Sequence, residues 1–167
     1  MRFLKTLLLG IAMLMASTSA PAQRLSQVDL EDINGTIVKL PSLQDGERPM
    51  LLVFWAFFRP DMRLFDAIER NMDEWSREVK FHVVTIAIGD NVPKIQSYIR
   101  GSNSWSGFTH LFDRSGEASE AARGDGVIDY HVPAVLIYDK SGKLVYHDKG
   151  YEEGKELKYF EILKGLQ

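Results

Sequence analysis

A continuous apolar run, "PMLLVFW" at residues 49–55, leads within a few residues into a long amphipathic pattern. The run has the length of a strand, and its lack of alternation indicates a strand buried on both faces. Between residues 61 and 80 the apolar side chains recur three or four positions apart, as on one stripe of a helix. These are Leu64, Ile68, Met72, Trp75 and Val79. A buried strand followed by a covering helix favours an α/β fold.

The rest of the chain continues this alternation of strand and helix. Two short runs around Asn34–Gly35, at residues 28–40, predict a β-hairpin. Residues 81–88 and 108–113 predict strands, and residues 93–100 and 117–123 predict short helices. Residues 134–147 predict a second hairpin that turns at Ser141–Gly142, and residues 152–166 predict a closing helix. We therefore expect a central mixed β-sheet with helices on both faces and an N-terminal β-hairpin.

The first 22 residues have the pattern of a secretory signal peptide. Arg2 and Lys5 precede an apolar stretch, and Ala20-Pro21-Ala22 supplies the small-x-small cleavage pattern. We expect cleavage before Gln23, which leaves one domain at residues 23–167, no membrane span, and export to the periplasm or the exterior. The alternative is a leader that is retained as an N-terminal anchor.

The chain contains no cysteine. Exported proteins occupy oxidising compartments that favour disulfides, so this absence is informative. The chain itself can form no disulfide, perform no thiol–disulfide exchange and supply no thiolate ligand to zinc.

The composition excludes two further classes of function. The formal charge of −3 and the isoelectric point near 5.8 argue against a nucleic-acid partner. The histidines lie far apart, without the spacing of metal ligands, and we expect neither a metal nor another cofactor. They are His82, His110, His131 and His147.

Three segments in this order resemble a known family: "DINGTIVKLPSL" at residues 32–43, "LLVFWAFF" at 51–58 and "VPAVLIYDKSGKLVY" at 132–146. The chain from Val28 onward is similar to the thioredoxin fold, and more narrowly to the exported TlpA/ResA-type thiol-disulfide oxidoreductases. That family carries the pattern F-W-A-x-W-C-x-x-C, with its first cysteine at the mouth of a helix.

The resemblance places the two cysteine positions on Arg59 and Met62, and the preceding tryptophan on Phe58. A guanidinium stays protonated, and a thioether forms no disulfide. The buried aspartate that moves protons in thioredoxins proper is replaced by Val53. The resemblance therefore implies the fold without the redox reaction. The family's cis-proline falls on Pro133, after Val132.

We call the segment "FRPDM" at residues 58–62 the altered corner. Two interpretations of it stay open at the level of sequence. Pro60 and Asp61 suit helix initiation, whereas Arg59 and the free N–H groups of the helix would suit a bound carboxylate. Aromatic side chains from Trp55 onward would wall the site, and the main chain before the proline would pair with an extended peptide. The candidate binding residues are Arg59, Asp61, Phe57, Phe58, His131, Val132 and Pro133.

The preferred hypothesis is a non-catalytic, exported module that binds an extended peptide or an envelope protein at this edge. One alternative is a redoxin-family protein that works with a cysteine-bearing partner, or that catalyses another reaction with Arg59, Asp61 and His131. A second alternative is a structural subunit of an envelope assembly. The oligomeric state stays open.

Overall fold

The computed structural model describes residues 24–57, 59–89, 91–102 and 104–167, with only the main chain at residues 59 and 60. The predicted signal peptide and Phe58 lie outside the described residues. Within the described part, no helix is long and apolar enough to cross a membrane.

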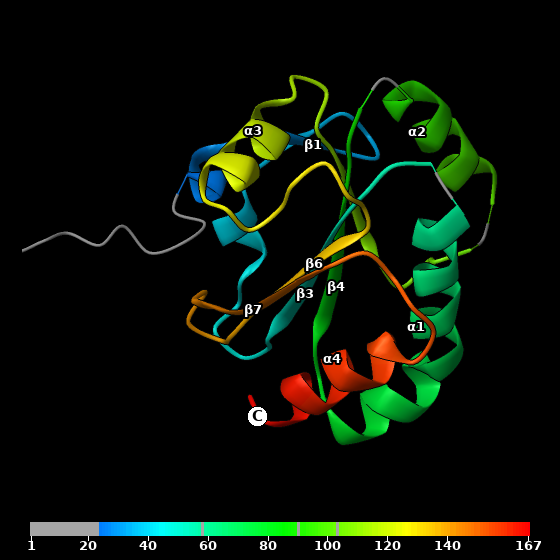
Figure 1. The fold of residues 1–167 in the computed structure, drawn as a ribbon, viewed down its shortest axis with the longest axis vertical. Coiled ribbons are helices and arrows are strands. Elements are labelled where there is room, and N and C mark those ends of the chain that lie inside the picture. Colours follow the sequence, from blue (N-terminus) through cyan, green and yellow to red (C-terminus); the bar gives the residue numbers. More distant parts are fainter. Residues whose placement is uncertain (1–23, 58, 90, 103) are drawn as a thin grey trace, which may run out of the picture.

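A seven-stranded mixed sheet forms the centre of the molecule, in the order β2-β1-β5-β4-β3-β6-β7 (Figure 1). The strands β3, β4 and β5 are parallel neighbours, and the outer strands join them antiparallel. Both predicted hairpins are present, as β1–β2 and β6–β7. The strands are β1 (Leu30–Asp32), β2 (Ile37–Val38), β3 (Met50–Trp55), β4 (His82–Ala87), β5 (Thr109–Phe112), β6 (Ala134–Tyr138) and β7 (Leu144–Lys149).

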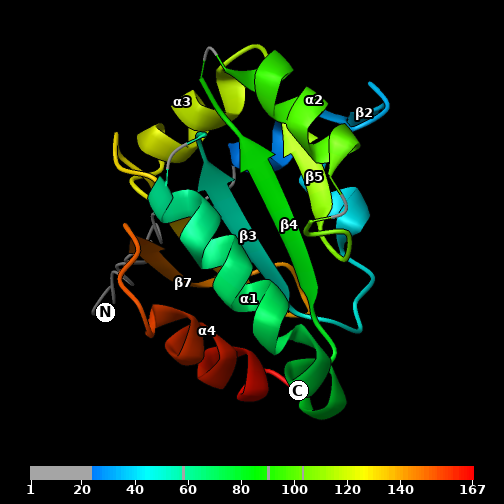
Figure 2. The same cartoon turned by 90° about the vertical axis from the view of Figure 1, so that its right-hand side faces the viewer.

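Helices cover both faces of this sheet, which confirms the predicted α/β class. Figure 2 shows α1 and α4 lying across one face, with α3 behind the sheet. The side chains of α2 join the core on the α1 side, while α3 shares the opposite core with two short 3-10 helices. The helices are α1 (Arg59–Glu78), α2 (Val92–Gly101), α3 (Glu117–Gly124), α4 (Lys155–Lys164), η1 (Leu25–Gln27) and η2 (Leu40–Leu43).

The position of β3 inside the sheet explains why its sequence is apolar throughout. Alternate side chains of a strand point to opposite faces, and both faces of β3 lie under helices. Leu51, Val53 and Trp55 enter the core beneath α1, α2 and α4. Met50, Leu52 and Phe54 enter the core beneath α3. All six residues are buried.

The stripe predicted for α1 also packs as expected. Leu64, Ile68, Trp75 and Val79 are buried, and Met72 is half-buried against the same core. The surface of α1 shows one contact that the sequence pattern does not reveal. The Asp66 carboxylate, on the exposed side of the helix, accepts a hydrogen bond from the indole N–H of Trp105 at 3.1 Å.

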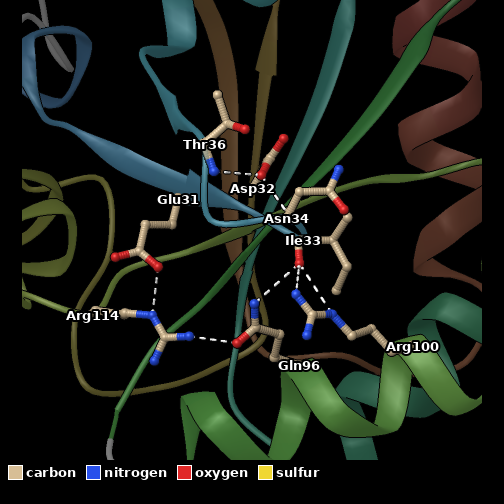
Figure 3. A network of polar contacts seen from close by, with 8 residues as sticks. All are labelled: Glu31, Asp32, Ile33, Asn34, Thr36, Gln96, Arg100 and Arg114. Carbon is tan, nitrogen blue, oxygen red and sulfur yellow. Dashed lines mark hydrogen bonds and ion pairs between the residues drawn. The ribbon is translucent and has the colours of Figure 1, made fainter.

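The N-terminal hairpin is tied to α2 by the polar network of Figure 3. The carbonyl oxygen of Ile33, at the tip of the hairpin, accepts hydrogen bonds from the Gln96 side chain at 3.1 Å and from the Arg100 guanidinium. Arg114, just after β5, pairs with Glu31 at 2.6 Å and also donates to Gln96. Side chains from three separate segments therefore meet at the hairpin.

Candidate functional site

The resemblance places the altered corner where β3 ends and α1 begins. Arg59 is the first residue of α1, and Met62 lies one turn further along, half-buried against the core. The structure thus puts the two former cysteine positions on the first turn of a long helix, as expected. The side chains of Arg59 and Pro60, and all of Phe58, lie outside the described residues, so their predicted contacts stay predictions.

Asp61 is fully buried, with none of its surface exposed. One carboxylate oxygen accepts the main-chain N–H of Ala56 at 2.8 Å. The side chain therefore fastens the segment after β3 to the first turn of α1. Of its two predicted roles, helix initiation fits this geometry, whereas direct contact with a ligand requires surface that the residue does not expose.

Phe57 lies half-buried on the side of the corner that faces α2. Its ring meets Tyr98 edge-on, with 5.2 Å between the ring centroids. The ammonium group of Lys94 lies 5.6 Å from the centroid of the Phe57 ring, in cation–π geometry. The contribution of α2 to this wall was missed at the level of sequence, because Phe57 and Tyr98 lie far apart along the chain.

Trp55 belongs to the core and does not line an open site, which corrects the prediction that it walls the corner. It is fully buried and meets Phe65 and Trp105 edge-on, at centroid distances of 4.9 and 5.8 Å. Trp105 has a left-handed main chain, with φ of 58°. The Glu69 carboxylate accepts its main-chain N–H at 2.6 Å. This aromatic cluster supports the corner from beneath.

The second wall of the corner is the segment that leads into β6. The Val132–Pro133 peptide bond is cis, as the resemblance implied. Pro133 is buried, and its carbonyl accepts the N–H of Gly150 at 2.7 Å. Because Phe54 pairs with Ala134, the chain at Val132 leaves the sheet beside Ala56. Among the described residues, the main chain of Val132 has no hydrogen-bond partner.

His131 points into solvent, with 81% of its side chain exposed. Its main-chain N–H and ring Nδ1 both lie within hydrogen-bonding distance of one Asp129 oxygen, at 2.7 and 3.0 Å. The other Asp129 oxygen pairs with Lys149 of β7 at 3.0 Å. The bond from the His131 N–H, reinforced by Lys149, lowers the pKa of Asp129 from 3.8 to about 2. Asp129 thus anchors the loop to β7, a role that the sequence did not suggest.

Tyr130, between Asp129 and His131 in the sequence, is 90% exposed. The Arg123 guanidinium of α3 lies 5.4 Å from the centroid of its ring. The corner therefore has an accessible aromatic ring on the β6 side, as well as the half-buried Phe57 on the α2 side.

The described corner contains neither a thiol nor a cluster of metal ligands. The sequence has no thiol, and within the described residues no group of three or more histidines and carboxylates could hold a metal ion. What the described corner offers is a free stretch of main chain at Val132, two aromatic rings and the cations beside them.

Comparisons with known proteins agree with this fold. Neither a protein-family model nor a curated protein matches the chain. A thioredoxin-like protein from Porphyromonas gingivalis superposes with a TM-score of 0.71 at 29% identity, covering 88% of this chain and 93% of that one. A DsbE-type thiol:disulfide interchange protein from Chlorobium tepidum gives 0.63 at 20% identity, covering 82% and 92%. A secreted disulfide oxidoreductase of Mycobacterium tuberculosis gives 0.57 at 22% identity, covering 82% and 95%.

The fold and the corner therefore define a thioredoxin-like protein. At the two positions where the resemblance places the redox cysteines of the thiol-disulfide oxidoreductases, this chain carries Arg59 and Met62.

Proposed function

We propose that this protein is an exported, non-catalytic module that binds an extended peptide, or an extended segment of an envelope protein, at the corner between α1 and β6. The observation that carries the proposal is the main chain of Val132, which has no hydrogen-bond partner in the described part of the chain. A peptide that aligns beside this segment gains main-chain hydrogen bonds in the manner of an added strand. Such pairing needs no cysteine.

The surroundings of Val132 support this assignment. Pro133 is buried and bonded to Gly150, and Asp129 ties the loop to Lys149. The segment is therefore held in place before a ligand arrives, which lowers the entropic cost of binding. Phe57 and Tyr130 provide apolar contact on either side.

The proposed location outside the cytoplasm rests on the pattern of the first 22 residues and on the similar structures. The similar protein of Mycobacterium tuberculosis is a secreted oxidoreductase, and another from Streptococcus pneumoniae is an exposed lipoprotein thioredoxin. An exported protein without cysteines keeps its fold when the redox state of the compartment changes, which suits a binding role.

The test is titration of isotope-labelled protein with a set of ten-residue peptides, followed through the NMR amide signals of Ala56, Phe57 and Val132. N-methylation at alternate peptide positions removes donors from one edge of an extended ligand. The two peptides to compare are methylated at the odd-numbered or at the even-numbered positions, which we call the two parities. We expect methylation in one parity to abolish binding. Methylation in the other parity is the matched control and should preserve binding. If no peptide moves these signals, or if both parities bind equally, strand-like pairing at Val132 is wrong.

A further inference from the structure

Two cations at the corner lie over aromatic rings, and neither has a carboxylate partner among the residues that the structure describes. Lys94 lies over Phe57 on the α2 side, and Arg123 lies over Tyr130 on the β6 side. Among the described residues, no carboxylate lies within ion-pair distance of either cation. The neighbouring cation Lys149 differs in this respect, because it pairs with Asp129. The charge of these two cations is therefore available to a ligand.

The topology brings the two aromatic–cation pairs to the same end of the sheet. Phe54 pairs with Ala134, so the chain after β3 and the chain before β6 leave the sheet as neighbours. Phe57 follows on the first segment, and Tyr130 precedes on the second. In Figure 1 the loops that carry them lie at the same end of the molecule, between α2 and α3. A peptide aligned with Val132 would pass between the two pairs.

Each of the two rings has a cation over it, although the chain as a whole carries a formal charge of −3. The loop at residues 129–133 contains one carboxylate, Asp129, which is already bonded to Lys149 and to the main chain at His131. An incoming carboxylate therefore meets unpaired cations here, whereas an incoming cation meets a carboxylate that is already satisfied.

We infer that the partner segment is acidic: an extended peptide with Asp or Glu residues on either side of the residue that pairs with Val132. This inference rests on the proposed function and adds the chemistry of the partner. Lys94 and Arg123 are the specificity-determining residues, each receiving a carboxylate while Phe57 and Tyr130 contact the adjoining methylene groups. A cation that already stacks on a ring loses less side-chain entropy when it binds a carboxylate, because its position is partly fixed.

The test compares three fluorescent ten-residue peptides that differ only in whether their alternate positions carry Glu, Gln or Lys. We expect the Glu peptide to bind at least about tenfold more tightly than the Lys peptide, with Gln between them. Raising sodium chloride from about 20 mM to about 500 mM should remove most of the difference, since exposed charges are screened. Lys94→Gln and Arg123→Gln should each weaken binding of the Glu peptide about three- to tenfold and leave the Gln peptide unchanged.

Arg77→Gln is the matched control, because Arg77 is an exposed cation in the last turn of α1, far along the helix from the corner. It should leave all three affinities unchanged. Equal binding of Glu and Gln peptides that still depends on the parity of N-methylation would overturn the acidic specificity and leave the proposed function standing. Absence of binding by every peptide would overturn both. Binding of anionic lipid vesicles or heparin, but not of the Glu peptide, would assign the cations to another class of partner and also overturn the inference.

Discussion

The residues at positions 59 and 62 decide which chemistry the first turn of α1 can support. In the thiol-disulfide oxidoreductases the helix N-terminus stabilises a thiolate, and a second cysteine one turn later resolves the mixed disulfide. Arg59 and Met62 occupy those two positions on an otherwise continuous helix. The two positions thus differ from that family in their side chains, whereas the helix that carries them is continuous.

The first prediction follows from the presence of Arg59 and Met62 at these two positions. The natural protein should not accelerate the reduction of insulin by dithiothreitol, whereas Arg59→Cys/Met62→Cys should do so measurably. The Cα atoms of residues three apart on an α-helix lie about 5 Å from each other, within the Cα separation that a disulfide can bridge. Each single cysteine variant is the control, because one thiol cannot close an intramolecular disulfide. Activity of the natural protein above that of a heat-denatured sample would contradict the assignment.

Asp61 carries a second prediction, on stability. Its buried carboxylate accepts the Ala56 N–H, so Asp61→Ala leaves that donor without its partner. We expect the free energy of unfolding to fall by about 1–3 kcal/mol, measured by urea denaturation. Asp61→Asn keeps an oxygen acceptor and should cost less. Asp73→Ala, at an exposed position of the same helix, should change stability by no more than about 0.5 kcal/mol; equal losses at positions 61 and 73 would refute the role given to Asp61.

Among the elements, the N-terminal hairpin depends most on side chains from elsewhere in the chain. The strand β1 pairs with β5 through only a few residues, and the tip is fastened by Gln96 and Arg100 of α2 at the Ile33 carbonyl (Figure 3). The same helix places Lys94 and Tyr98 against Phe57. Thus α2 connects the hairpin with the corner.

The third prediction concerns this connection. Arg100→Ala and Gln96→Ala each remove donors to Ile33, and together they should speed amide hydrogen exchange in β1 and β2 roughly tenfold, equivalent to the loss of about one net hydrogen bond. Exchange in β3 and β4 should change little, because the central strands open only with the whole fold. Arg77→Ala provides the control. Unchanged exchange at Leu30 and Val38 in the double variant would show that the ladder with β5 suffices.

At the scale of the whole molecule, the half-buried histidine His110 links stability to pH. The Trp105 carbonyl can only accept a hydrogen bond, so His110 Nε2 carries the proton and Nδ1 accepts the Thr85 hydroxyl. Burial lowers the pKa of His110 below its ordinary value of 6.5, which the Trp105 carbonyl opposes only in part. The folded protein thus holds a neutral imidazole at a pH where the unfolded chain binds a proton.

The fourth prediction concerns how the free energy of unfolding depends on pH. Above pH 6.5, His110 should contribute no pH dependence to the free energy of unfolding. Below this value, the free energy of unfolding should fall as the pH drops. The slope contributed by one such group is at most about 1.4 kcal/mol per pH unit. Urea denaturation at a series of pH values should show the slope in the natural protein and lose it in His110→Asn. His147→Asn, at an exposed position on β7, is the matched control. A slope that survives in His110→Asn would assign it to another group.

The sequence by itself determined the order of strands and helices and the absence of thiol chemistry. Strand β3 and helix α1 could be predicted because burial imposes a periodicity that is written locally, in the apolar run at residues 49–55 and in the stripe from Leu64 to Val79. The hairpin at Asn34–Gly35 was equally local. The missing cysteines at positions 59 and 62 required only composition and the resemblance to the family.

Only the tertiary structure decided which side chains form the corner. Trp55 and Asp61 are buried, Tyr130 and His131 are exposed, and Lys94 comes from a helix far along the chain. None of these outcomes has a local signal, because exposure depends on which layers pack over a residue. The pairing of Phe54 with Ala134 joins segments about 80 residues apart, and the packing of α2 and α3 beside them places a cation over each ring.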